Sequence, residues 1–170
     1  GQYFLCVRIF EFVLLFLLAQ INSNLAVLAD TRKPILQTTK IERRLFWFSV
    51  VMCLLTLLIT PLIVNFIFSL NIENYSFLIH IFLGTLFACI GSIKGPWVSK
   101  NNRFYFNLRC TFLGGIFALA YLFLFEPQNI IGVAFSFAFG QFMVNVFIPL
   151  FSKVEREFIF NLITLKKRIL

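Results

Sequence analysis

The stretch "GQYFLCVRIFEFVLLFLLAQ" (residues 1–20) is apolar almost throughout, yet it carries Arg8 and Glu11 three residues apart. A helix needs about 20 such residues to cross a hydrocarbon core. On a helix the two charges share a face and can pair, and Asn22 returns to that face roughly three turns after Glu11. Because a charge in hydrocarbon costs about 3 kcal/mol or more, we expect this face to border a wet or protein-lined cavity. A salt bridge near the membrane surface is the alternative.

The composition of the whole chain agrees with a membrane location. Its 170 residues are 60% hydrophobic and only 13% charged, whereas soluble domains carry about a quarter charged residues. The formal net charge is +8, but the Lys and Arg residues sit in the gaps between apolar runs rather than on one patch, which argues against nucleic acid as a partner. The sequence therefore predicts an all-α integral membrane protein.

Five apolar stretches are long enough to span a bilayer, and a mixed tail follows them. We predict transmembrane helices at 3–29, 45–68, 77–98, 104–125 and 130–152. Pro61 and Pro96 should kink or break their helices, because proline removes a helix hydrogen bond. The tail, 153–170, is typical of a basic amphipathic helix lying on the inner leaflet.

The basic residues also predict the orientation of the chain. Lys and Arg occur in the connections 30–44 and 99–109 and in the tail, but not in the connections 69–76 and 126–129. The positive-inside rule therefore places the basic segments in the cytoplasm and Gly1 outside. Since the chain starts with Gly1 inside an apolar run, we expect it to be part of a longer protein.

Small and amide side chains recur along the helices. Three rows of small residues at four-residue spacing predict close helix packing: Gly132, Ser136 and Gly140; Gly84 and Ala88; Gly114 and Ala118. Gln141 and Asn145 are neighbours on one face of the last span. Such amides usually hydrogen-bond to other helices, and contact with a substrate is the alternative.

A second polar group lies toward the predicted cytoplasmic side. Lys94 is a turn or two deeper in its span than Lys100, and Arg109 begins the next span. Together with Trp97 they predict an entrance that concentrates anions, although Trp97 by itself is also typical of an interfacial anchor.

Patterns for other chemistry are missing from the sequence. His80 is the only histidine, and the cysteines, Cys6, Cys53, Cys89 and Cys110, form no CxxC pair, so we expect neither a metal site nor a cofactor. The seven acidic residues are scattered and no phosphate-binding loop is present. The sequence thus favours a transporter over an enzyme.

Three segments resemble one family. "GQYFLCVRIFEF" resembles the G-x-Y-x-x-x-x-R-[IL]-x-E opening of a late helix in the O-antigen flippases, which belong to the multidrug/oligosaccharidyl-lipid/polysaccharide exporter superfamily. "GPWVSKNNRFYFNLRCTFLGG" is similar to the family's glycine-tryptophan-arginine segment, and "NIIGVAFSFAFGQF" to its last helix. The order and loop lengths agree over nearly the whole chain. "INSNLAVLAD" lacks the proline that the family often has there, and Ser136 replaces a usual Ala.

The resemblance implies both an architecture and a substrate. The chain would be most of the second six-helix half of a flippase in the bacterial inner membrane, and its partner would be the missing N-terminal half. The substrate would be an undecaprenyl-diphosphate-linked oligosaccharide that crosses from the cytoplasmic to the periplasmic leaflet by alternating access. The substrate cavity would use Arg8, Glu11, Asn22, Gln141 and Asn145, and the cytoplasmic entrance Lys94, Trp97 and Arg109.

Three other functions fit the sequence less well. Another exporter of the superfamily would share the architecture, but a cation exporter should place acids on its cavity faces and only Glu11 qualifies. A membrane enzyme of polysaccharide assembly would need a catalytic His or acid cluster elsewhere in a longer chain. A structural subunit that transports nothing is the remaining alternative.

Overall fold

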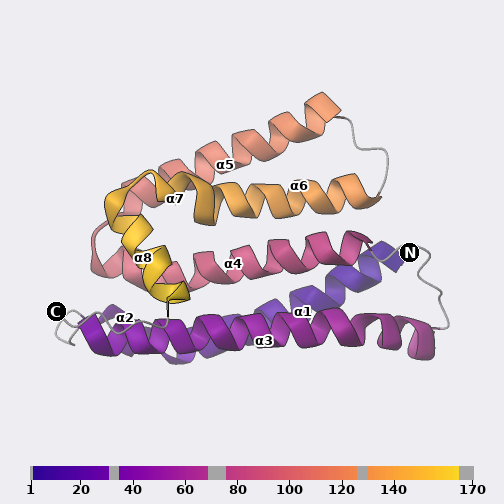
Figure 1. Cartoon of the computed structure of the whole chain (residues 1–170), viewed down its shortest axis with the longest axis horizontal. Coiled ribbons are helices and arrows are strands. Elements are labelled where there is room, and N and C mark those ends of the chain that lie inside the picture. The colour runs from indigo at the N-terminus through magenta and orange to yellow at the C-terminus, as the bar shows by residue number, and fades with distance from the viewer. Residues whose placement is uncertain (1, 31–34, 69–75, 126–129, 165–170) are drawn as a thin grey trace.

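The computed structural model describes residues 2–30, 35–68, 76–125 and 130–164, and every element within these ranges is helical (Figure 1). The elements are α1 (Gln2–Ser23), α2 (Leu25–Ala29), α3 (Ile35–Phe68), α4 (Ser76–Lys100), α5 (Phe104–Phe125), α6 (Ile130–Phe142), the π-helix η1 (Met143–Phe147), α7 (Ile148–Leu150) and α8 (Lys153–Ile163). In the described part of the chain, five stretches are long and apolar enough to cross a membrane: α1, α3, α4, α5 and the continuous α6–η1–α7. The predicted all-α architecture is therefore confirmed for the described residues, with five helical stretches that could span a membrane.

The five long helices run alternately up and down, with α4 in the centre (Figure 1). One side of α4 packs against α1 and α3, and the other packs against α6, which in turn contacts α5. The segment α2, the turn between α4 and α5, and the helix α8 all lie at the left-hand end of Figure 1. We call this the basic end, because it gathers every described Lys and Arg except Arg8.

Local hydrogen bonding sets where the helices break. Asn24 separates α1 from α2: its side-chain amide donates to the Gln20 carbonyl at 2.9 Å, and the Ser23 hydroxyl donates to the same oxygen at 2.8 Å. Asn and Ser compete with helical hydrogen bonds in this way, so the predicted span 3–29 is interrupted without a proline.

Neither Pro61 nor Pro96 breaks its helix. Both α3 and α4 continue through Pro61 and Pro96 without a break, and α3 begins at Ile35 rather than at 45. The irregular turn precedes Pro149 instead. Proline has no N–H to offer the carbonyl four residues earlier, and the π-helix η1 widens the chain there, with Ile148 N–H bonding to the Met143 carbonyl.

Hydroxyl side chains inside the spans form their hydrogen bonds within their own helix. Each donates to the carbonyl oxygen four residues earlier, at 2.7–3.1 Å: Ser49, Thr56, Thr60, Thr85, Ser92 and Thr111. These groups therefore need no water and no partner on another helix, which suits a hydrocarbon surrounding.

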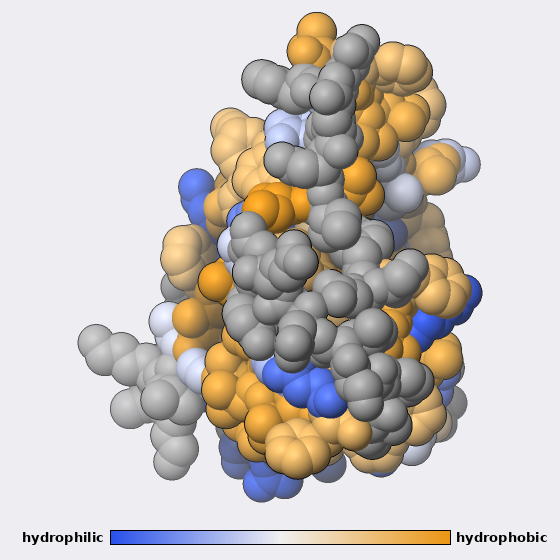
Figure 2. All heavy atoms as spheres, turned by 90° about the vertical axis from the view of Figure 1, so that its right-hand side faces the viewer, coloured by the Kyte–Doolittle hydropathy of each residue, from blue (hydrophilic) through white to orange (hydrophobic). Residues whose placement is uncertain are grey.

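The outside of the bundle is apolar. Figure 2, which views the end opposite the basic end, shows apolar side chains around the described flanks. Large side chains such as Phe66, Phe112 and Phe123 are more than two-thirds exposed. In water such a surface would drive association, whereas in a bilayer it meets the acyl chains.

The predicted small-residue rows lie at helix contacts. A Cβ atom added to Gly84 would lie 2.3 Å from the Phe137 ring on α6, and one added to Gly114 would lie 3.0 Å from the backbone nitrogen of Val144 in η1. On α6, a Cβ at Gly140 would lie 3.0 Å from Ala118 on α5. Glycine at these positions lets the backbones approach closely.

Helix α8 folds back onto the bundle. Its apolar residues Phe158, Ile159 and Leu162 are buried in a cluster with residues of α1, α2, α3 and α4, whereas Phe160 and Ile163 remain about half exposed. The amphipathic helix expected at the membrane surface thus packs one apolar face against the protein and leaves its other apolar residues exposed.

Close packing at Gly114 gives a testable consequence with a built-in control. Gly114→Ala should lower the free energy of unfolding by about 1–3 kcal/mol, because the added methyl overpacks the contact with η1. Gly115→Ala adds the same methyl where nothing lies within 4 Å, so it should be neutral or slightly stabilising. Reversible unfolding in mixed detergent micelles, followed by circular dichroism, measures both. Equal effects of the two substitutions would contradict this packing.

Candidate functional site

The ion pair expected on the first helix is present. Arg8 Nη1 lies 2.7 Å from Glu11 Oε2, and the guanidinium also stacks over the Phe4 ring at 4.6 Å. The side chains are 60% and 48% exposed, and Asn22 further along α1 is exposed too. The three predicted polar residues of α1 are therefore exposed on the surface of the described bundle.

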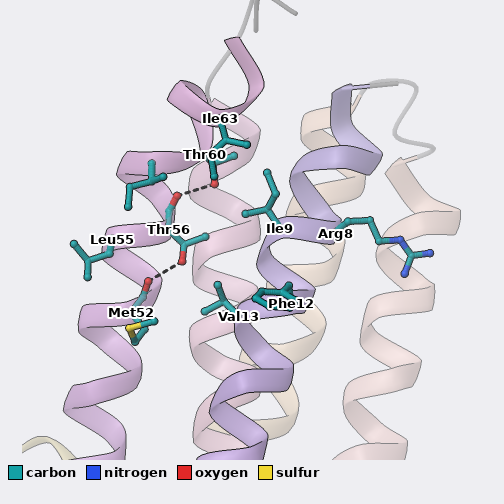
Figure 3. Close-up of a pocket in the computed structure, with 10 residues that line it drawn as sticks. Arg8, Ile9, Phe12, Val13, Met52, Leu55, Thr56, Thr60 and Ile63 are labelled. Carbon is teal, nitrogen blue, oxygen red and sulfur yellow. Dashed lines mark hydrogen bonds between the residues drawn. The ribbon is translucent and has the colours of Figure 1, made fainter. Parts of the chain in front are cut away.

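Beside this pair lies a groove of about 490 Å³ between α1 and α3 (Figure 3). Its lining is apolar apart from Arg8, Thr56 and Thr60: Ile9, Phe12, Val13, Met52, Leu55, Ile59 and Ile63. Both threonine hydroxyls donate to their own helix, and Figure 3 shows the Arg8 guanidinium pointing away from α3. The groove thus offers a surface for hydrocarbon, not for a sugar.

Gln141 and Asn145 lie elsewhere. Asn145 Nδ2 donates to Gln141 Oε1 at 2.9 Å, so this bond runs along one helix and does not link two helices. Asn145 is 7% exposed and packs so closely on α4 that a Cβ at Gly91 would lie 2.3 Å from its Oδ1. Gln141 lines a second groove, between α5 and α6. The predicted cavity residues are therefore split between an exposed face of α1 and a packed interface.

The basic end holds the most unusual polar cluster of the described residues. Arg103 forms a two-point ion pair with Glu155 of α8: Nε lies 2.9 Å from Oε1 and Nη2 lies 3.1 Å from Oε2. Arg103 Nη2 also donates to Ser152 Oγ at 3.2 Å, and the Ser152 hydroxyl donates to Glu155. The Glu155 side chain is fully buried, whereas the Arg103 side chain is 36% exposed.

Lys94 lies in the same cluster without a partner. Its side chain is 1% exposed, and Nζ has no hydrogen bond to any described residue. Nζ lies 5.8 Å from the centre of the Phe106 ring, over which Arg103 also stacks at 5.4 Å. The ammonium interacts electrostatically with both Glu155 and Arg103. Glu155 thus pairs with Arg103 alone, and Lys94 lies beside the pair without a hydrogen bond of its own.

The other two predicted entrance residues lie in different surroundings. Trp97 packs against Phe158 of α8, with ring centres 4.9 Å apart and the rings tilted by 38°. Arg109 is exposed on α5. The structure therefore brings Lys94 and Trp97 together beneath α8 and leaves Arg109 at the surface.

The sequence pattern did not indicate Arg103, Ser152 or Glu155 as site residues. A signal for two of them was present, since Ser152 and Glu155 have the S-x-x-E spacing of a helix N-terminus and α8 begins at that point. Arg103 is positioned by the α4–α5 turn. Asn102 adopts a left-handed conformation with φ of 53°, and the Arg103 N–H returns to the Val98 carbonyl at 3.0 Å.

The ion pair shifts both ionisation equilibria. Burial by itself raises the pKa of Glu155, but hydrogen bonds from Arg103 and Ser152 outweigh that effect and hold the pKa below its ordinary value of 4.5. The hydrogen bond to Glu155 and its charge raise the pKa of Arg103 in turn. The pair therefore stays ionised at neutral pH and ties α8 to the bundle.

Comparison with known proteins identifies no relative: no family model, no curated protein and no solved structure matches the chain. The described residues also contain no group of three or more His, Cys, Asp or Glu side chains placed to hold a metal ion. The chemistry that the cluster at the basic end offers is the binding of an anion by Arg103 and Lys94.

The lowered pKa of Glu155 predicts an acid-induced release of α8. Its contribution to docking is complete above about pH 4.5 and is lost as the pH falls through the lower folded-state pKa. In a Trp47→Phe background, Trp97 emission should therefore be constant from neutral to mildly acidic pH and change only below that value.

Two substitutions on α8 separate this effect from general acid denaturation. Glu155→Gln should abolish the transition, because no carboxylate remains to be protonated at the pair. Glu157→Gln removes the same charge from an exposed position of α8 and should leave the transition in place. A transition that moves with Glu157 and not with Glu155 would contradict the assignment.

Proposed function

We propose that this chain is part of a flippase that carries an undecaprenyl-diphosphate-linked oligosaccharide from the cytoplasmic to the periplasmic leaflet of a bacterial inner membrane. The observation that carries the proposal is Lys94: an ammonium 1% exposed, unpaired among the described residues, beside Arg103 and near one end of a membrane helix. An uncompensated buried charge is costly to keep, so its presence favours a role in binding an anion.

The two ends of such a substrate have matching surfaces on the bundle. A diphosphate is strongly anionic, and the basic end supplies cations to receive it. An isoprenoid chain is pure hydrocarbon, and the groove between α1 and α3 supplies an apolar lining along the membrane helices. In this proposal the basic end faces the cytoplasm, as the positive-inside rule predicts, and alternating access moves the headgroup.

The outward-facing polar residues of α1 fit a two-half transporter. Arg8, Glu11 and Asn22 are exposed on the described five-helix bundle, where lipid contact would be costly. We infer that a second half of the same protein covers this face, so that the residues border a cavity between the halves. Gln141 and Asn145 then act mainly in packing, as the Gly91 contact supports.

Removing the unpaired charge tests the entrance directly. Lys94→Met in the full-length protein should reduce surface O-antigen at least tenfold in a flippase-null strain, because the diphosphate loses a cation. Folding should survive, since the change removes an uncompensated buried charge. The matched control is Lys40→Gln, which removes an exposed positive charge of α3 at the same end and should keep wild-type polysaccharide. Wild-type O-antigen with Lys94→Met, at equal protein level, would contradict the proposal.

A second substitution tests the cavity face. Arg8→Ala in the full-length protein should abolish surface O-antigen at unchanged protein level, whereas Arg8→Lys, which keeps the charge, should retain part of it. Immunoblots of lipopolysaccharide and of the membrane fraction provide both measurements. If Arg8→Ala leaves O-antigen unchanged, Arg8 has no part in transport.

A further inference from the structure

The docking of α8 depends on few polar contacts. The bidentate pair between Arg103 and Glu155 is the ion pair that joins α8 to the rest of the described bundle. Arg43 adds a hydrogen bond from Nε to the Asn161 carbonyl at 3.1 Å. The other contacts are apolar, through Phe158, Ile159 and Leu162. Removal of the carboxylate would thus leave a short helix held mainly by three side chains.

Two basic side chains lie beside one carboxylate in the docked state. Glu155 binds Arg103, and Lys94 Nζ is left without a hydrogen bond among the described residues. The Glu155 carboxylate accepts hydrogen bonds from Nε and Nη2 of Arg103 but makes none with Lys94. A phosphate or diphosphate group carries more negative charge and more acceptor oxygens than a carboxylate, so it would satisfy both cations.

The cluster can also be reached from outside the protein. The Arg103 side chain is 36% exposed although its carboxylate partner is fully buried. Arg103 sits on the tight turn between α4 and α5, where the left-handed Asn102 fixes its backbone. An incoming anion would therefore meet Arg103 first and Lys94 behind it.

We propose that Glu155 occupies the position of a phosphate group, and that a lipid-borne phosphate arriving at the basic end displaces it and releases α8. Helix α8 is then a strap that closes the anion site between Arg103 and Lys94 until the ligand arrives. This inference deepens the proposed function, on which the choice of a lipid diphosphate rests. The strap itself is argued from the Arg103–Glu155 pair and the neighbouring Lys94, without the flippase proposal.

The experiment measures the position of α8 in the full chain, in nanodiscs. Spin labels are placed at Phe160→Cys on α8 and Tyr105→Cys on α5, both more than half exposed, after the four buried native cysteines are replaced by alanine. Pulsed electron paramagnetic resonance then gives the docked and released populations. We expect one docked distance in phosphatidylcholine alone, and a second, longer one when undecaprenyl diphosphate is present.

Three variants test the residues. Glu155→Gln should raise the released population at least tenfold without any ligand, because Arg103 loses its carboxylate. Glu157→Gln, with the same charge change at an exposed position, should leave α8 docked. Lys94→Met should leave α8 docked but raise at least tenfold the undecaprenyl diphosphate needed for release. Docking that is indifferent to Glu155→Gln would overturn the strap.

Two further arms identify the source of the phosphate. Phosphatidylglycerol nanodiscs and dissolved inorganic pyrophosphate should both be much weaker than undecaprenyl diphosphate. Release by inorganic pyrophosphate alone would overturn the lipid source while supporting the anion site. If Glu155→Gln releases α8 but no phosphate compound does, the anion site is overturned, and the O-antigen assay of Lys94→Met still decides the flippase function independently.

Discussion

Hydrocarbon offers no hydrogen-bond partner, and this constraint governs the placement of polar groups throughout the bundle. Ser and Thr hydroxyls inside the spans donate to carbonyls of their own helix, as at Thr56 and Thr60. Buried atoms that lack a partner among the described residues are therefore conspicuous, and they include Lys94 Nζ and Lys100 Nζ at the basic end and Asn65 Oδ1 in α3. No hydrogen bond within the described residues accounts for the burial of the Lys94 and Lys100 amino groups, and both lie at the basic end.

The same constraint explains the division of the molecule into packed and exposed polar faces. On α4, Gly84 and Gly91 permit close approach of α6 and η1, which leaves Asn145 only 7% exposed. On α1, Arg8 and Glu11 neutralise one another but stay exposed. Pairing reduces the free-energy cost of placing charged side chains in a bilayer but does not remove it. Covering this face of α1 with protein or water would lower that cost further.

Helix α8 connects this packing to the chemistry of the basic end. Its apolar face completes a core cluster with α1, α2, α3 and α4, while Glu155 at its first turn neutralises part of the charge of Arg103 and Lys94. A carboxylate in the first turn is favoured by the helix dipole as well. One short helix thus covers an apolar surface and pairs with Arg103 at the same time.

The sequence by itself determined the five spans, their alternation, the Arg8–Glu11 pair and the gathering of basic residues at one end, because hydrophobic run length, helical spacing and charge distribution are local properties. It did not show that α1 breaks at Asn24 or that Asn145 packs on Gly91, since these depend on side-chain geometry and on neighbouring helices. The tertiary structure alone joined Glu155 to Arg103, 52 residues apart, and buried Lys94 behind them, because only the fold-back of α8 brings these charges together.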